Sequence, residues 1–179
     1  MDDAPFRTLA VRTLHRNRWI ELQQHEVEVR ASGRRFTYTY LSSRPSVMVV
    51  ALPTPQEILL IRQYRYPSRR FSYELPGGGA GGLQPEEAAW EELRQETGYS
   101  AGRLEKLGEF VVYCGLSDEI CHAFLATELT PGAPELEETE HLSVERASLQ
   151  RLDQMIATGE FADGMGLAAL RLAGPRFER

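Results

Sequence analysis

The chain has 179 residues, 42% of them hydrophobic and 26% charged, and its formal net charge is −6. These values are typical of a globular protein with one core, with room for a small extension. The acidic balance excludes non-specific nucleic-acid binding, because a phosphate backbone requires a basic surface. The longest apolar run, residues 47–52, is too short to cross a bilayer, so we expect no membrane partner.

The cysteine content indicates the compartment. Cys114 and Cys121 are the two cysteines, and their spacing suits neither a disulfide framework nor a zinc site. The first residues begin with two acids and carry no apolar segment, which does not resemble a signal peptide. We therefore expect reduced thiols in a cytoplasmic protein.

The first third of the chain contains short alternating segments. Residues 19–22, 26–30 and 35–40 predict a short antiparallel meander, with a turn at Ser32 and Gly33. Residues 46–52 and 57–62 predict two apolar strands joined by a proline-containing turn.

The remaining segments mix helices and strands. A helix is predicted over residues 86–97, because Pro85 suits its first turn and Gly98 its C-terminal cap. Strands before and after a single central helix, with two helices at the end, predict an α/β sandwich around a mixed sheet. The segments after the central helix are predicted as a hairpin (105–113 and 119–129), a strand (141–146) and helices (148–157 and 164–172).

Five glycines lie within residues 77–82, directly before the central helix. The run satisfies G-x-G-x-x-G, but a dinucleotide site also needs an acid about 20 residues on, after the next strand. Here that distance ends in the same helix, which argues against such a site. No Gly-Lys-Ser/Thr follows, so a Walker A loop is excluded. A plain turn and a metal-binding loop both remain open.

The acids of the central helix favour the metal-binding loop. Glu92 and Glu96 are four residues apart and share one face of the helix, a spacing of like charges that costs about 0.2–0.5 kcal/mol. Glu96 also lies in the last turn, where the helix dipole disfavours an anion by roughly 0.3–1 kcal/mol. A divalent cation between these carboxylates would reverse both penalties.

These residues carry a family resemblance. The helix and its loop resemble the Nudix box, G-x5-E-x7-R-E-U-x-E-E-x-G-U, where U is apolar, with Gly77 at the start and Glu92, Glu96 and Gly98 in place. Further segments resemble the ADP-ribose pyrophosphatase branch of the Nudix hydrolases. They are residues 62–67, 74–76, 115–119 and 159–163.

The resemblance implies a Nudix-type α/β/α sandwich around a mixed sheet, formed by residues 45–179. Residues 1–44 would form a small antiparallel β extension, a candidate dimerisation element. The implied activity is metal-dependent hydrolysis of the diphosphate bond in a nucleoside diphosphate linked to a sugar. ADP-ribose would give AMP and ribose 5-phosphate, with Mg²⁺ or Mn²⁺ as cofactor and a homodimer as the assembly.

The resemblance also assigns roles to single residues. Glu92 and Glu96 correspond to the main metal ligands, and the loop length places Gly77 where a backbone carbonyl binds metal. Glu140 is the candidate general base, with Glu119 as the competing base or ligand. The residues implied to bind substrate are Arg62, Arg65, Glu74 and Glu119.

Three positions depart from the box, namely Leu83, Glu91 and Gln95, where the family places glutamate, arginine and glutamate. The first two resemble a structural pair, and their joint loss avoids leaving one charge unpaired. Gln95 can form hydrogen bonds but supplies no anionic charge. The departures indicate a reduced metal site and leave an alternative, a catalytically impaired Nudix-fold protein that binds a nucleotide-sugar.

Overall fold

A computed structural model describes residues 4–136 and 141–177 of the chain. The chain divides into two compact units, the first made of residues 4–44 with 111–119 and the second of residues 45–110 with 120–177. Each unit is described by itself. No helix within the described residues is both long and apolar enough to span a membrane.

The first unit is a three-stranded antiparallel sheet. Its strands are β1 (Phe6–Arg16), β2 (Glu21–Val29) and β3 (Arg35–Ser42), in the order β1-β2-β3. Residues 111–119 attach to β3, where Ser42 Oγ donates to Asp118 Oδ2 at 2.9 Å and Tyr38 Oη donates to the Gly115 carbonyl at 2.9 Å. A segment distant in sequence therefore completes this unit.

The antiparallel meander is confirmed, but its strand bounds differ from the prediction. Residues 19–22 and 26–30 were expected as separate pieces, but residues 21–22 and 26–29 lie in the single strand β2. Strand β1 was not predicted as a full strand, because almost all of its residues are exposed and two register shifts interrupt its pairing with β2. Without a buried face, a strand lacks the clear alternation on which such a prediction depends.

The second unit contains two sheets. One has the order β7-β4-β9-β8 and is mixed, because β4 pairs with β7 in antiparallel and with β9 in parallel orientation. The other has the order β10-β5-β6, and both of its pairings are antiparallel. The strands are β4 (Ser46–Ala51), β5 (Glu57–Arg65), β6 (Arg70–Glu74), β7 (Gly77–Gly79), β8 (Arg103–Val111), β9 (Ile120–Thr127) and β10 (Leu142–Ser148).

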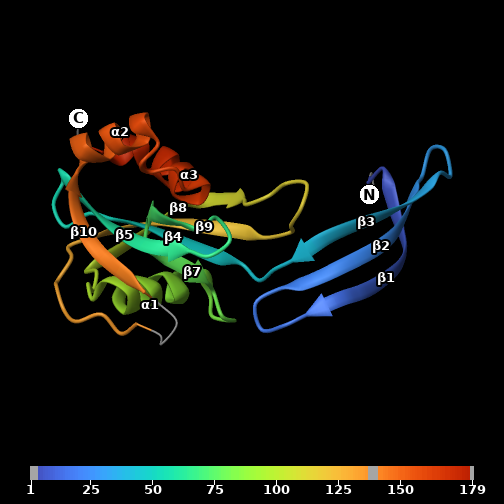
Figure 1. Ribbon diagram of the computed structural model, residues 1–179, viewed down its shortest axis with the longest axis horizontal. Coiled ribbons are helices and arrows are strands. Elements are labelled where there is room, and N and C mark those ends of the chain that lie inside the picture. Colours follow the sequence, from blue (N-terminus) through green and yellow to red (C-terminus); the bar gives the residue numbers. More distant parts are fainter. Residues whose placement is uncertain (1–3, 137–140, 178–179) are drawn as a thin grey trace. The chain divides into compact units, whose positions relative to one another are not determined.

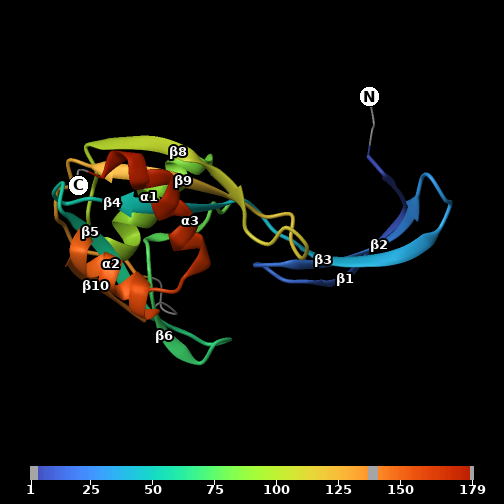
Figure 2. The same cartoon turned by 90° about the horizontal axis from the view of Figure 1, so that it is seen from above.

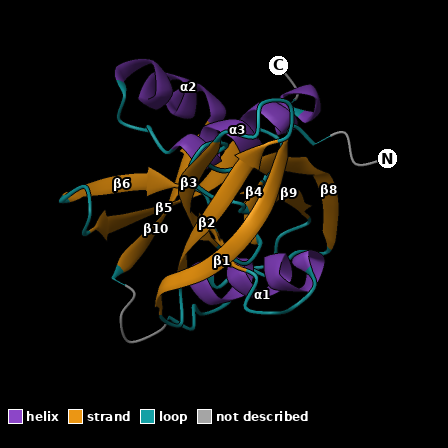
Figure 3. Cartoon of the chain, turned by 90° about the vertical axis from the view of Figure 1, so that its right-hand side faces the viewer, coloured by secondary structure: helices purple, strands orange, loops and turns teal. Residues whose placement is uncertain are grey.

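Three helices cover these strands. Helix α1 (Pro85–Thr97) lies on one side, and α2 (Leu149–Thr158) and α3 (Gly164–Ala173) lie on the other (Figures 1 and 3). A short 3-10 turn, Gly174–Arg176, follows α3. The layers confirm the predicted α/β/α sandwich around a mixed sheet. The core under α1 contains Val47, Val49, Leu59, Ala88, Ala89, Leu93 and Phe124.

The helix boundaries follow from local signals, of which Pro85, Gly98 and Gly159 were predicted from the sequence. Helix α1 starts at Pro85 and ends where Gly98 adopts a left-handed φ of 75° and donates to the Arg94 carbonyl. The Ser148 side chain caps α2, and Gly159 ends it with a φ of 75°. Asp163 caps α3 by accepting from the Met165 and Gly166 amides.

Two strands of the second unit were missed, β6 shortly before the glycine run and β7 within it. Strand β6 lies at the outer edge of its sheet (Figure 2), and its first two residues are exposed. Strand β7 consists of three glycines, which have no side chains to show alternation. Residues 77–79 are therefore not a plain turn but a short strand held against β4.

Candidate active site

The last turn of α1 contains a buried carboxylate. Glu96 is only 5% exposed, and its Oε2 accepts a hydrogen bond of 2.7 Å from the Gly77 amide. Pairing with β4 holds Gly77 in place, with a φ of 154°. A Cβ at this position would lie 2.2 Å from the Val47 carbonyl oxygen, so only glycine fits between β4 and α1.

Glu92 lies against the next glycine. A Cβ on Gly78 would lie 2.6 Å from Glu92 Oε1, closer than van der Waals contact allows. Both carboxylates on this face of α1 therefore approach the backbone of β7 at positions where a side chain would interfere. This contact explains why the sequence places glycines opposite the acidic helix face.

The donor set suits a hard divalent cation that keeps part of its water shell. Mg²⁺ is often bound by one or two carboxylates together with water and substrate phosphates. Glu92 and Glu96 supply the two carboxylates, and the lack of side chains on Gly77 and Gly78 lets the backbone of β7 lie directly against them. Within the described residues no group of three or more His, Cys, Asp or Glu side chains forms a metal site.

A second polar cluster involves Arg65. Its Nη2 and Nε bond to the Glu74 carboxylate at 2.5 and 2.9 Å, and Gln63 Nε2 donates to the same carboxylate at 2.9 Å. Glu74 is 5% exposed, so these donors offset the cost of burying its carboxylate. The hydrogen bond with Glu74 is the main reason why the Arg65 pKa is raised, and the negative charges of Glu96 and Asp163 add to it.

Asp163 is a member of this cluster that the sequence did not single out. Its Oδ2 accepts from the Gly166 amide at 2.7 Å, at the start of α3. Burial raises the Asp163 pKa, and the negative charge of Glu74 adds to the rise, while the amide hydrogen bonds and Arg65 oppose it. An Asp directly before Gly-Met-Gly is a helix-cap signal, but its proximity to Arg65 is a tertiary property.

Arg62 does not join this cluster. Successive side chains of a strand point to opposite faces, so Gln63 and Arg65 share one face of β5 and Arg62 lies on the other. The Arg62 guanidinium stacks on the Phe71 ring, with its carbon 4.0 Å from the ring centroid. The two arginines that the sequence grouped for substrate binding are thus separated by the sheet.

Comparison with known proteins gives the family. The NUDIX domain matches residues 42–165, which is more than half of the chain. The chain belongs to the NUDIX family. It is a Nudix hydrolase, as the resemblance of the glycine loop and the paired glutamates to the Nudix box implied.

Relatives of this Nudix hydrolase span nearly its whole length. An ADP-ribose pyrophosphatase of Bacillus subtilis is 30% identical over 92% of this chain and 90% of its own. A methanol dehydrogenase activator of Bacillus methanolicus is 27% identical over the same shares. Among solved structures, an ADP compounds hydrolase matches with a TM-score of 0.85 over 97% of this chain and 94% of its own, at 24% identity. This last match supports the fold.

The other candidate residues are described one by one. Glu119 belongs to the first unit, where its carbonyl accepts from the Val112 amide. Glu140 lies outside the described residues. Leu83 and Glu91, which replace the box glutamate and arginine, are both exposed. Their replacement therefore leaves no buried charge without its partner.

Proposed function

We propose that this Nudix hydrolase cleaves the diphosphate bond of a nucleoside diphosphate linked to a sugar, with ADP-ribose as the first substrate to test. The observation that carries the proposal is the position of Glu92 and Glu96 against the glycine strand, with the Arg65–Glu74 pair electrostatically close to Glu96. The Bacillus subtilis relative is an ADP-ribose pyrophosphatase, which supports the choice of substrate.

The metal is proposed to be Mg²⁺ or Mn²⁺. Glu92 and Glu96 would hold it, with the Gly77 carbonyl as a further ligand. The Gly77 amide already bonds to Glu96, which keeps that carboxylate beside β7. When bound, such a cation neutralises diphosphate charge and makes water a better nucleophile.

The other residues would bind and orient the substrate. Glu74 holds Arg65 through Nε and Nη2, and among the described residues nothing accepts from its Nη1. Nη1 is therefore available to a diphosphate oxygen, and half of the Arg65 side chain is exposed to receive one. Glu119 is retained as a second candidate for substrate contact.

The reaction consumes one water. Water attacks one phosphorus of ADP-ribose, the bond from that phosphorus to the bridging oxygen breaks, and AMP and ribose 5-phosphate leave. Glu140 is proposed as the base that takes the proton from water, on the strength of the family resemblance. The water proton thus passes to a carboxylate.

A product assay tests this proposal. The chain is incubated with ADP-ribose and other nucleotide-sugars, with Mg²⁺ or Mn²⁺, and the products are separated by chromatography. Release of AMP and ribose 5-phosphate, lost in Glu96→Gln, is the expected result. Binding of the nucleotide-sugar without turnover under either metal would instead establish the alternative, an impaired Nudix protein that only binds such a ligand.

The assembly is proposed to be a homodimer formed through the N-terminal strands. Several large apolar side chains of the first unit are exposed and could be covered by a second copy, among them Phe6, Val11, Leu14 and Trp19. Light scattering of the purified chain and of Val11→Glu would test this, since the charge should shift a dimer to monomer. Among the described residues neither Cys114 nor Cys121 forms a disulfide, which suits the proposed cytoplasmic location.

A further inference from the structure

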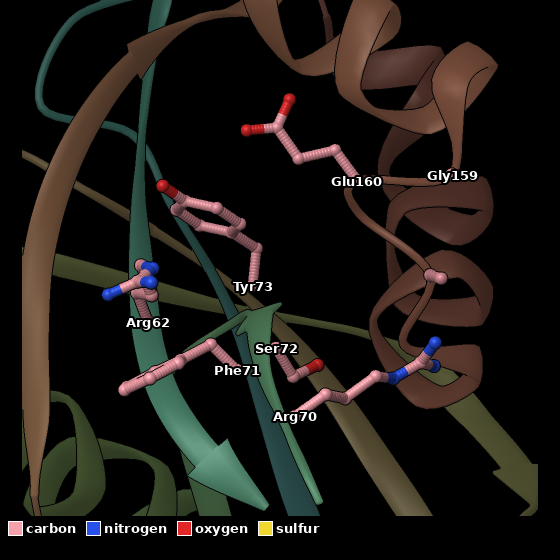
Figure 4. Close-up of a pocket in the computed structure, with 8 residues that line it drawn as sticks. Arg62, Arg70, Phe71, Ser72, Tyr73, Gly159 and Glu160 are labelled. Carbon is pink, nitrogen blue, oxygen red and sulfur yellow. The ribbon is translucent and has the colours of Figure 1, made fainter. Parts of the chain in front are cut away.

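A pocket lies beside β6 and is separate from the paired glutamates. It encloses about 270 Å³ and is bordered by β5, by β6 and by the segment that joins α2 to α3 (Figure 4). Four consecutive residues of β6, residues 70–73, line it, and β6 pairs only with β5 among the described strands. The pocket therefore follows the free edge of this strand, where backbone groups remain available to a ligand.

The guanidinium of Arg62 is held within this pocket by stacking. Phe71 covers one face of the group at 4.0 Å, and a second aromatic contact, 5.6 Å between ring centroids, holds Phe71 against Tyr64. Stacking uses the face of a guanidinium and leaves its N–H groups, which lie in the plane, free to donate. Within the described residues no carboxylate forms an ion pair with Arg62, although its side chain is half-buried.

The acids at the pocket are already engaged. Glu160 accepts two hydrogen bonds from Arg151 of α2, at 2.7 and 2.6 Å, so its charge is already paired. Glu145 accepts from the Tyr73 hydroxyl at 3.2 Å. Tyr73 stays protonated at neutral pH, because burial above all, and then the charge of Glu145, raises its pKa. Arg62 and Arg70 are thus the charges without an acidic partner among the described pocket residues.

We propose that this pocket binds a small anion, a phosphate or carboxylate group that accepts N–H bonds from Arg62. A planar guanidinium fixed by an aromatic ring is already oriented for two parallel hydrogen bonds to such a group. The proposed anion site is centred on the Arg62 guanidinium, which lies on the opposite face of β5 from Arg65 and Glu74, although Arg70 and Ser72 of the pocket share the face of Arg65 and Glu74. It does not depend on the proposed hydrolysis.

The test follows the arginine side-chain N–H signals by NMR while inorganic phosphate or acetate is added to the full chain. We expect a saturable change of the Arg62 Nε–H signal with at least one anion. The anion that binds with the higher affinity identifies the ligand class. Arg62→Gln should lower the affinity for the anion at least tenfold. The affinity of Arg62→Lys should lie between those of the parent and Arg62→Gln, since lysine keeps the positive charge but lacks the two parallel N–H donors of a guanidinium. Arg176→Gln, which removes an arginine already paired with Glu105, should bind as the parent does.

Two results would overturn the proposal. One is the absence of a saturable Arg62 response to either anion, or equal affinity in the parent and in a folded Arg62→Gln. The other is loss of the Arg62 response in Glu96→Gln, which would show that the pocket belongs to the same site as Glu92 and Glu96. Circular dichroism of each variant establishes that it is folded, and no step of the test requires turnover.

Discussion

The Gly77 amide donates a 2.7 Å hydrogen bond to the carboxylate of Glu96, and this contact joins β7 to the last turn of α1. It accounts for an anion at a helix position where the dipole is unfavourable. The backbone N–H satisfies part of the buried charge, and the lack of a side chain on Gly77 lets the strand come this close. The acids on this face of α1 and the glycines of β7 are therefore parts of one structural feature, the close contact between the helix and the strand.

The neighbouring glycine offers a sharp test of this feature. In Gly78→Ala the new Cβ would lie 2.6 Å from Glu92 Oε1, so the Glu92 side chain must turn away while the backbone stays. We expect a folded protein whose Mn²⁺ affinity, measured by calorimetry, falls about tenfold, equivalent to roughly 1.4 kcal/mol. Gly79→Ala is the matched control, because nothing lies within 4 Å of its Cβ. Equal losses in both variants would contradict the role of Glu92.

Removal of Arg65 should leave a buried carboxylate without its main donor. Glu74 is 5% exposed, and Arg65 donates three hydrogen bonds to it beside the one from Gln63, so Arg65→Ala should lower the free energy of unfolding by about 1–3 kcal/mol. Urea denaturation measures this loss. A second change, Glu74→Gln, should recover part of it, since it removes the unpaired charge. If the double variant is less stable than Arg65→Ala alone, the pair does not act as described.

Asp163 predicts a pH dependence of stability. Burial raises the folded-state pKa above the ordinary value of 3.8, so the folded protein holds this proton more tightly than the unfolded chain. Its stabilising contribution is therefore complete below pH 3.8 and is lost as the pH rises through the higher folded-state pKa.

Urea denaturation of the parent and of Asp163→Asn across this range isolates that contribution. Asparagine also caps helices, so the variant should keep α3. The parent should lose stability relative to Asp163→Asn as the pH rises from below 3.8 toward neutrality. A difference that does not change with pH would show that burial of Asp163 has no effect on its titration.

The box glutamine predicts a gain of function. Gln95 is half-buried on α1 between Arg94 and Glu96, so Gln95→Glu would add a third carboxylate near the proposed metal. We expect Mn²⁺ to bind about tenfold more tightly by calorimetry, and kcat/KM for ADP-ribose to rise. Glu91→Gln is the control, because Glu91 is exposed and its charge should not affect the metal. Unchanged affinity in Gln95→Glu would place residue 95 outside the metal site.

The sequence by itself determined the family, the layered fold and the limits of α1. Pro85 and Gly98 act through local backbone geometry, and the spacing of Glu92 and Glu96 follows from the helix repeat, so no distant contact is needed to predict them. The order of helices and strands was sufficient for an α/β sandwich around a mixed sheet, and the family resemblance implied its α/β/α layers.

Only the tertiary structure decided which side chains meet. Strand β5 was predicted to end at Arg62 but continues to Arg65, because β6 pairs with its last residues. That extension places Arg62 and Arg65 on opposite faces and gives each a different partner, Phe71 and Glu74. Likewise, the three glycines of β7 are a strand because β4 supplies their hydrogen bonds, and Asp163 meets the charge of Arg65 across a separation of almost one hundred residues. Such contacts depend on which segments the folded core brings together, and sequence periodicity does not predict them.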